Sequence, residues 1–278
     1  AGVFNEGMRT LVTGGTGFIG SNLALRLEER GDDVVITGTS GERNLPTFRG
    51  RRLPRDVTQR DWDTLEALDA VFHLAAINDT TLLDRAAMIR ANVEASQRIF
   101  ADAVRHGCRR IVYASSTAVY GDAPAPYRED GPVRPLNPYA ESKLLLDEFA
   151  RSFARDHPDV VVVGLRYCNV YGPGEAHKGK RASMIFQLAQ QMVLGNPRLF
   201  QYGEQRRDYL FVGDAVQANL LAASARESCL VNCGSGVATS FNDLVAILNE
   251  ALGTRRVPEY IENPYADRYQ SHTECDMT

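Results

Sequence analysis

The chain has 278 residues, of which 44% are hydrophobic and 24% are charged, proportions typical of a globular protein with a sizeable buried core. Its formal net charge of -4 gives no electrostatic reason to expect nucleic acid as a partner. No apolar run approaches the roughly 20 residues that span a bilayer, and the first residues lack the pattern of a signal peptide. We therefore expect a cytoplasmic protein without membrane contact.

The cysteines are scattered and do not form a recognisable metal or redox motif. There is no CxxC pair, and no histidine stands at metal-ligand spacing. We expect reduced thiols and no bound metal. The five cysteines are Cys108, Cys168, Cys229, Cys233 and Cys275.

The chain begins with alternating strand and helix patterns. Residues 9–13 form a short apolar run, and residues 18–29 then show apolar side chains at helical spacing, ending before Gly31. Longer helical patterns cover residues 82–106 and 139–156. Further short β-branched runs, each suited to a strand buried on both faces, occupy residues 34–37, 70–75, 110–115 and 160–166.

This alternation predicts an α/β fold of the Rossmann type, with a doubly wound parallel sheet. Past Gly172 the pattern is less regular, with a helix at residues 182–194 and a strand near Leu199. The arginine-rich stretch 49–55 is typical of a solvated loop. We expect a nucleotide-binding domain at 8–170, with a return segment at about 208–235, and a smaller substrate-binding lid formed by 171–207 and 236–278.

A glycine-rich turn lies between the first strand and the first helix. Gly14, Gly17 and Gly20 have the spacing that lets a backbone turn tightly, approach a pyrophosphate, and pack a helix closely on a strand. The helix N-terminus offers unpaired N–H groups to the same anion. The turn therefore predicts dinucleotide binding.

The end of the second strand bears on the choice of nicotinamide cofactor. An acidic residue there ordinarily binds the ribose 2′-hydroxyl of NAD, but this chain has Gly38. Ser40 and Arg43 follow and are suited to a 2′-phosphate, which favours NADP over NAD. Arg43 is also consistent with a plain surface residue.

Tyr139 and Lys143 are four residues apart and share one face of the predicted helix. A nearby ammonium and an oxidised nicotinamide favour the phenolate form of a tyrosine, which makes it an acid/base near neutral pH. Ser116 follows the fourth predicted strand, where a hydroxyl can share a proton with the tyrosine and the substrate. An isolated Tyr-x-x-x-Lys pair is otherwise common on exposed helix faces.

With these motifs, residues 8–278 resemble the extended short-chain dehydrogenase/reductase family, also described as NAD-dependent epimerases/dehydratases. The resemblance implies that Ser116, Tyr139 and Lys143 form a catalytic triad. It also implies that two later loops line a tightly bound, recycled dinucleotide. The cofactor-binding residues expected are Gly14, Thr16, Gly17, Phe18, Ile19, Gly20, Ser40, Arg43, Asp56, Val57, Leu74, Ala75, Ala76, Tyr139 and Lys143.

The resemblance also implies a set of substrate contacts. Arg207 matches an arginine that commonly meets a diphosphate in this family, and an arginine fork suits that oxygen-rich group. Asn169 belongs to the segment that leads into the substrate domain. The substrate-binding residues expected are Ser116, Thr117, Asn169, His177, Arg207 and Tyr269.

The residues after Ser116 distinguish between reactions of the family. The 4,6-dehydratases have an Asp-Glu pair there to eliminate water, whereas this chain has Thr117 and Ala118. Residues 174–184 and 265–270 resemble the ADP-glycero-manno-heptose 6-epimerases, in which a lysine of the His-Lys-Gly segment is thought to be a second acid/base. Lys178 matches that lysine.

We therefore expect a nucleotide-sugar epimerase that oxidises its substrate transiently to a ketone. Alternatives within the family are a UDP-sugar 4-epimerase and a UDP-uronate decarboxylase. An alternative of another class is a non-catalytic, NADP-binding redox sensor, against which the intact triad argues. The predicted helices 82–106 and 139–156 are of the kind that pair in dimers of the family, so we also expect a homo-oligomer.

Overall fold

Seven parallel strands form the central sheet of the computed structural model, which describes residues 7–39, 44–59, 65–264 and 269–278. The order of strands across the sheet is β10-β6-β5-β4-β1-β2-β3. The doubly wound α/β fold predicted from the sequence is confirmed. The strands are β1 (Arg9–Thr13), β2 (Asp33–Thr37), β3 (Arg51–Leu53), β4 (Ala70–His73), β5 (Arg110–Ser116), β6 (Val161–Tyr167) and β10 (Cys229–Cys233).

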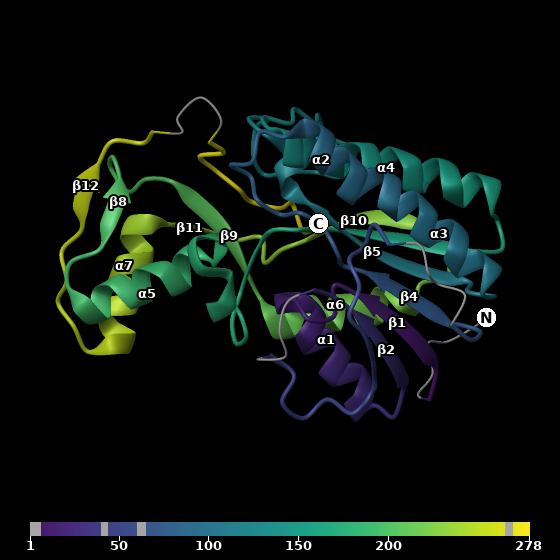
Figure 1. Cartoon of the computed structure of the whole chain (residues 1–278). Coiled ribbons are helices and arrows are strands. Elements are labelled where there is room, and N and C mark those ends of the chain that lie inside the picture. The colour runs from purple at the N-terminus through teal and green to yellow at the C-terminus, as the bar shows by residue number, and fades with distance from the viewer. Residues whose placement is uncertain (1–6, 40–43, 60–64, 265–268) are drawn as a thin grey trace.

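Helices cover both faces of this sheet (Figure 1). On one face lie α1 (Phe18–Glu29) and α6 (Val212–Ala223); on the other lie α2 (Arg85–Ile89), α3 (Ala95–Arg105) and α4 (Pro138–Asp156). A π-helical turn at Arg90–Glu94 joins α2 to α3, and a 3₁₀ helix, Thr117–Tyr120, follows β5. Within the described ranges, no helix has the length and apolar character needed to cross a bilayer.

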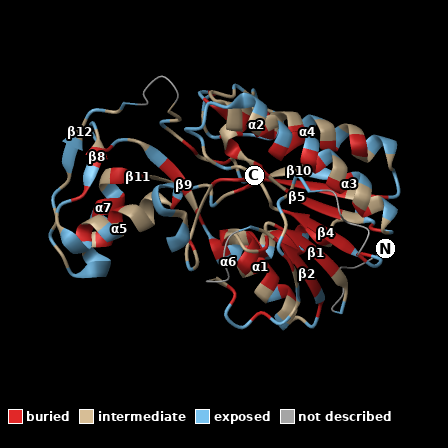
Figure 2. Ribbon diagram, in the orientation of Figure 1, coloured by how far each residue is buried: buried red, intermediate tan, exposed pale blue. Residues whose placement is uncertain are grey.

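Alternate side chains of each strand enter two separate cores, as the period of two in a strand requires. Val12 packs with Leu23 and Leu27 under α1, whereas its neighbour Leu11 packs in the core that contains Phe100. Figure 2 shows the central strands as a buried layer between these helices. The apolar runs of the sequence are therefore explained by burial on both faces.

A smaller group of elements lies beside the carboxyl ends of the central strands (Figure 1). Leu188, Met192, Phe241 and Leu244 form its own core between two helices. The three-stranded sheet has the order β11-β9-β7, and the two-stranded sheet pairs β12 with β8. The elements are β7 (Asn169–Tyr171), the 3₁₀ segment Ala176–Arg181, α5 (Met184–Leu194), β8 (Arg198–Phe200), β9 (Arg206–Phe211), β11 (Ala238–Ser240), α7 (Phe241–Leu252) and β12 (Glu259–Ile261).

Several predicted elements differ from the observed ones. The stretch 49–55, predicted to be a solvated loop, contains the edge strand β3, because its backbone pairs with β2. The helix predicted from residue 82 starts at Arg85, where the Asp84 side chain caps it by accepting from the Ala87 N–H. Helices α6 and α7 were not predicted from the sequence.

Candidate active site

The glycine turn after β1 brings three backbone segments into close contact. Gly14 has a φ of +69°, and a Cβ there would lie 2.8 Å from the Ala75 nitrogen. A Cβ on Gly20 would lie 2.1 Å from the Gly14 oxygen. Gly17 caps α1 without a side-chain hydrogen bond, and the first turn of α1 has no acidic residue. The N–H groups and the positive end of the helix dipole are therefore directed to an external anion.

A cleft of about 690 Å³ opens at this turn. This volume is within the range of small-molecule and cofactor sites, and the lining extends from the glycine turn past the ends of β2 and β4 to Ala114. Ser40 and Arg43, expected to bind a 2′-phosphate, lie outside the described residues. The other predicted residues on its walls are Gly14, Thr16, Gly17, Phe18, Ile19, Gly20, Asp56, Val57, Leu74, Ala75, Ala76, His177 and Lys178.

A buried hydrogen-bond chain fixes one wall of the cleft. The Ala75 N–H donates to Thr13 Oγ1 (3.2 Å), which contacts His73 Nδ1 (2.7 Å). On the other side of the ring, Nε2 contacts Ser96 Oγ (2.7 Å), which donates to the Asn92 carbonyl (2.8 Å). Since the Ser96 proton is used in that last bond, His73 is assigned as the neutral Nε2–H tautomer that accepts from Thr13.

Ser116, Tyr139 and Lys143 lie near the cleft, although none of the three is among the residues that line it. The Ala114 residue of β5 lines the cleft, and its carbonyl accepts a hydrogen bond from Lys143 Nζ (2.8 Å). The Lys143 ammonium also lies 5.9 Å from the centre of the Tyr139 ring, as two residues one helical turn apart allow. The Ser116 hydroxyl lies close enough to that of Tyr139 to influence its pKa. The spacing noted in the sequence thus produces one connected group.

The protein surroundings of the triad shift its pKa values in a definite direction. Desolvation raises the pKa of Tyr139, and the nearby Ser116 hydroxyl opposes this increase. Desolvation lowers the pKa of Lys143 to about 8, whereas the charge of Asp147 raises it. The sequence led us to expect that the Lys143 ammonium and an oxidised nicotinamide together lower the tyrosine pKa. In the protein alone, the effect of burial outweighs the groups that favour the phenolate, so the positive charge of a nicotinamide ring would be needed in addition.

A buried ion pair supports the helix that carries the triad. Arg166 Nε donates to Asp147 Oδ2 at 2.9 Å, and both side chains are almost fully buried. Tyr113 on β5 donates to the other oxygen of Asp147 (3.1 Å). These bonds fasten α4 to β5 and β6, and removal of one partner from such a pair typically costs about 3–5 kcal/mol.

The segment that contains Lys178 contributes to the wall of the cleft. Lys178 Nζ lies 5.2 Å from the centre of the Phe18 ring, and burial lowers its pKa. Asn22 donates to the Pro173 carbonyl (3.0 Å), and Asn44 donates to the Gly174 carbonyl (2.9 Å). These asparagines were not predicted from the sequence, because nothing in their local pattern indicates a partner more than 100 residues away.

The buried carboxylate of Glu175 organises the same segment. It accepts hydrogen bonds from the Gly172 N–H (2.9 Å), the Ser183 N–H (2.6 Å) and the Ser183 hydroxyl (3.1 Å). These bonds close the loop onto the start of α5, where the Ser183 hydroxyl also accepts from the Phe186 N–H. Lys178 is therefore presented to the cleft by a supported loop rather than by a free one.

Most of the predicted substrate residues lie near the C-terminal segment, residues 269–278. The guanidinium of Arg207 lies between the rings of Phe241 and Tyr269, at 5.5 Å and 5.0 Å. Asn169 accepts from the Thr273 hydroxyl (3.1 Å). Thr117 is buried and donates to the Tyr167 carbonyl (3.1 Å), so its hydroxyl stabilises the strand end. His177 is exposed and lines the dinucleotide cleft.

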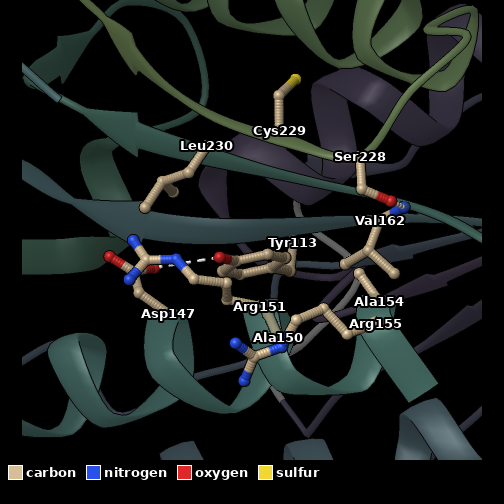
Figure 3. Close-up of a pocket in the computed structure, with 10 residues that line it drawn as sticks. All are labelled: Tyr113, Asp147, Ala150, Arg151, Ala154, Arg155, Val162, Ser228, Cys229 and Leu230. Carbon is tan, nitrogen blue, oxygen red and sulfur yellow. Dashed lines mark hydrogen bonds between the residues drawn. The ribbon is translucent and has the colours of Figure 1, made fainter. Parts of the chain in front are cut away.

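A second hollow of about 310 Å³ lies between α4 and the strands β6 and β10 (Figure 3). Tyr113, Arg151, Arg155 and Cys229 contribute to its walls. Tyr113 and Asp147 both line it, and Figure 3 shows the hydrogen bond between them. None of the sequence-predicted site residues that the structure describes lines it.

Comparison with known proteins agrees with this geometry. Residues 10–234 match the model of the NAD dependent epimerase/dehydratase family. The chain is 39% identical to the ADP-L-glycero-D-manno-heptose-6-epimerase of Alkalilimnicola ehrlichii, over 96% of this chain and 89% of that protein. The chain therefore belongs to the NAD dependent epimerase/dehydratase family, and the resemblance noted in the sequence is confirmed.

Two solved structures refine the comparison. The ADP-L-glycero-D-manno-heptose-6-epimerase of Helicobacter pylori superposes with a TM-score of 0.89 at 37% identity, covering 97% of this chain and 88% of that one. The UDP-N-acetylglucosamine 4-epimerase of Methanobrevibacter ruminantium, solved with UDP-N-acetylmuramic acid, gives 0.90 at 28% identity, covering 98% and 90%. The expected class, an NAD(P)-dependent enzyme of the epimerase type, is confirmed.

Proposed function

We propose that this chain is a nucleotide-sugar epimerase whose substrate is an ADP-heptose, inverted at carbon 6 through a transient ketone. The observation that carries the proposal is the grouping of Ser116, Tyr139 and Lys143 next to Ala114, which lines the glycine-turn cleft. The likeness to two heptose epimerases, each over nearly the whole chain, supports the substrate class.

The triad divides the proton transfer among its three side chains. A bound nicotinamide dinucleotide supplies the hydride acceptor for the oxidation and the hydride donor for the return step. Tyr139 takes the proton of the sugar hydroxyl as the carbon is oxidised. Ser116 hydrogen-bonds to the oxygen of Tyr139 and to that of the sugar hydroxyl. Lys143 remains fixed to the Ala114 carbonyl and faces the ring of Tyr139. It stabilises the negative charge that develops on the phenol oxygen.

Lys178 acts as the second acid/base. It serves the substrate pose in which the ketone turns its opposite face to the hydride donor. Its lowered pKa and its place on the cleft wall support this role. A lysine must be desolvated to exchange protons near neutral pH, and the Phe18 ring contributes to that desolvation. If Lys178 only contacts a phosphate, its removal will weaken binding instead of turnover.

The residues after Ser116 argue for epimerisation rather than for elimination. Thr117 and Ala118 begin a 3₁₀ helix, with the Ala118 N–H bonded to Ser116 Oγ (3.1 Å). The Thr117 hydroxyl is already bonded to the Tyr167 carbonyl. Neither residue offers the acid and base that loss of water requires. The ketone is therefore reduced back without elimination.

The preferred cofactor is NADP. A Cβ on Gly38 would lie 2.0 Å from Thr16 Oγ1, so the place where NAD-specific relatives carry an acidic side chain is filled by Thr16. No carboxylate at that position repels a 2′-phosphate. Release of the cofactor from purified protein, followed by mass measurement, tests this preference; recovery of NAD alone would contradict it.

Residues 8–170 and about 208–235 form the nucleotide-binding domain, and residues 171–207 and 236–278 form the substrate-binding lid. The return of the chain to the central sheet through β10, and the packing of α6 on α1, support this division. Arg207 binds the diphosphate from the lid side, with Tyr269, Asn169 and His177 as further contacts. The protein acts as a cytoplasmic homo-oligomer that pairs through α3 and α4.

The direct test is incubation of the full chain with ADP-heptose, UDP-glucose, UDP-N-acetylglucosamine and UDP-glucuronate, followed by NMR of the sugar protons. Inversion at carbon 6 of the ADP-heptose supports the proposal. Inversion at carbon 4 of a UDP-sugar, or release of carbon dioxide from UDP-glucuronate, would assign the chain to another reaction of the family. Cofactor binding without any conversion would instead indicate a redox sensor.

A further inference from the structure

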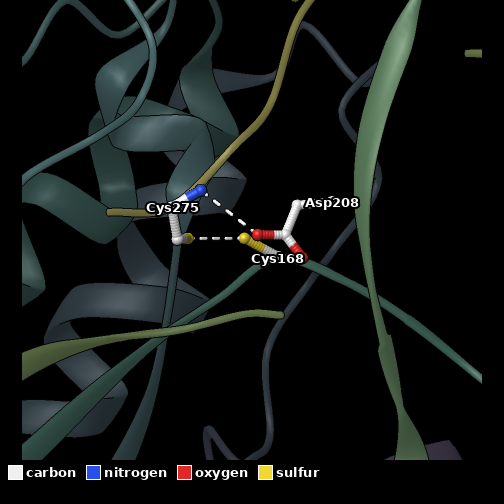
Figure 4. Close-up of side chains that lie close together, drawn as sticks. All are labelled: Cys168, Asp208 and Cys275. Carbon is white, nitrogen blue, oxygen red and sulfur yellow. Dashed lines mark hydrogen bonds between the residues drawn. The ribbon is translucent and has the colours of Figure 1, made fainter. Parts of the chain in front are cut away.

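Two cysteines that are far apart in the sequence lie side by side where the C-terminal segment, residues 269–278, meets the end of β6 (Figure 4). Cys168 follows β6, and Cys275 lies on the segment Tyr269–Thr278. Their sulfur atoms are 2.7 Å apart, and both residues are buried. This separation is only about 0.7 Å beyond the ~2.0 Å of a disulfide bond. The pair needs little movement to become bonded.

The carboxylate of Asp208 completes this cluster, but its oxygens are already occupied. Oδ1 accepts from the Ser235 N–H and hydroxyl, both at 2.7 Å. Oδ2 accepts from the N–H groups of Gly236 (3.0 Å) and Cys275 (3.1 Å). Because four donors saturate it, this carboxylate anchors the backbone of the C-terminal segment and has little capacity left for a metal ion.

The distance between the sulfurs also speaks against a metal. Two thiolates on a tetrahedral zinc, with Zn–S bonds of about 2.3 Å, are roughly 3.8 Å apart. The observed 2.7 Å is too short to admit an ion between the two sulfurs. The geometry therefore fits a direct sulfur–sulfur bond better than a shared ligand.

The C-terminal segment is attached to two other parts of the chain. The Asp208 N–H donates to the Thr273 carbonyl (2.9 Å), and the Tyr127 N–H donates to the Glu274 carbonyl (2.7 Å). Thr273 and Cys275 face inward, whereas Ser271 and Met277 are exposed. Side-chain hydrogen bonds of Gln270 and Thr273 and the ion pair of Arg128 with Asp276 (3.2 Å) also hold the segment. It contributes no helix and no strand of the central sheet, so it can separate locally without unfolding either. Such opening exposes both sulfurs.

We propose that Cys168 and Cys275 form a reversible disulfide that locks the C-terminal segment down under oxidising conditions. The oxidant is a low-molecular-weight disulfide such as oxidised glutathione. The Cys275 thiolate attacks one sulfur of that reagent and releases one small thiol. The Cys168 thiolate then attacks the Cys275 sulfur of the mixed disulfide and releases the second. Two protein thiols lose their protons and two electrons, and one reagent disulfide becomes two thiols.

The disulfide between Cys168 and Cys275 is also expected to affect substrate exchange, and this effect alone rests on the proposed function. Gln270 donates to the Thr117 carbonyl (3.2 Å), next to Ser116, and Thr273 donates to Asn169 (3.1 Å). Tyr269 stacks on Arg207 at 5.0 Å. The segment therefore covers the side of the site to which the sugar nucleotide is assigned. A disulfide at Cys275 prevents the segment from lifting and slows the exchange of substrate for product.

The first test uses the full chain and oxidised glutathione. After treatment and alkylation of the remaining thiols, digestion without reductant is expected to yield a peptide pair linked through Cys168 and Cys275. The Cys275→Ser variant is expected to lose this species, and the matched Cys108→Ser variant, altered at a buried thiol outside the cluster, to retain it. Modification of the exposed Cys229 without any Cys168–Cys275 link would overturn the proposal. Stoichiometric zinc binding that blocks alkylation of both thiols would do the same.

The second test measures whether the disulfide restricts local opening of the C-terminal segment. Amide exchange in residues 269–276 is expected to slow by about tenfold or more in the oxidised protein, to return to its former rate with dithiothreitol, and to be unaffected by oxidant in Cys275→Ser. Unchanged exchange in the oxidised protein would refute the locking of the segment. Turnover is expected to fall severalfold in parallel. Because mass and exchange need no substrate, they separate failure of this proposal from failure of the assigned reaction.

Discussion

Lys143 on α4 donates a hydrogen bond from Nζ to the carbonyl oxygen of Ala114 on β5, over 2.8 Å. The bond joins the helix that carries Tyr139 to the strand that ends at Ser116, so one lysine sets the relative position of the other two triad residues. Burial lowers the Lys143 pKa to about 8, which still leaves the ammonium protonated at neutral pH. The lysine therefore contributes both geometry and charge.

Replacement of Tyr139 by phenylalanine is expected to abolish turnover while cofactor binding persists. The substitution removes only the hydroxyl, and a general acid/base is worth about 10²–10⁴-fold in rate. Epimer formation followed by NMR, together with the absorbance of bound cofactor, checks both parts. Full activity in Tyr139→Phe would show that another group moves the proton.

His73 is expected to make the stability of the protein sensitive to acid. Burial lowers its pKa from 6.5 to about 3, and protonation of Nδ1 would remove the acceptor of the Thr13 hydrogen bond. Below pH 6.5 the unfolded chain binds this proton and the folded chain does not, so stability falls as pH decreases from 6.5 towards 3. The expected loss is about 1.4 kcal/mol per pH unit over this window.

The contribution of His73 to stability can be isolated by urea unfolding. The native chain and His73→Asn are compared at neutral pH and two pH units below. The variant is expected to be less stable at neutral pH, because the Thr13 and Ser96 hydroxyls lose a well-placed partner. Its stability is also expected to depend less on pH than that of the native chain. His177→Asn, at an exposed histidine, serves as the control. Equal slopes for the native chain and His73→Asn would rule out His73 as the titrating group.

Local sequence patterns were sufficient to predict most of the residues on one side of the glycine-turn cleft. The glycine turn and the Tyr139–Lys143 spacing depend on residues within one or two helical turns, and strand ends at a parallel sheet converge by topology. Long-range pairing was not accessible in this way. β3 exists because β2 offers a free edge, and the Cys168–Cys275 contact joins residues 107 positions apart. No local pattern records either partner.

Lys178→Met is expected to reduce turnover by about 10²-fold with little effect on folding or on cofactor binding. Methionine keeps most of the apolar stem that packs near Phe18, and the loop itself is held by Glu175 rather than by the lysine. Single-turnover measurements can separate reduction of the ketone from substrate binding. Lys180→Met, at a neighbouring exposed lysine, is the matched control. An unchanged rate in Lys178→Met, or a change in KM alone, would exclude the second acid/base role.

Gly20→Ala is expected to disrupt the cofactor site by separating α1 from β1. The added Cβ would lie 2.1 Å from the Gly14 oxygen, and because that atom belongs to the backbone, α1 must move away from β1. We expect a loss of about 3 kcal/mol in the free energy of unfolding and cofactor binding weakened by about tenfold or more. Gly195→Ala is the control, since Gly195 has an extended backbone and open space around its Cβ position. If Gly20→Ala binds cofactor as tightly as Gly195→Ala, close packing of helix and strand at this turn is not what positions the dinucleotide.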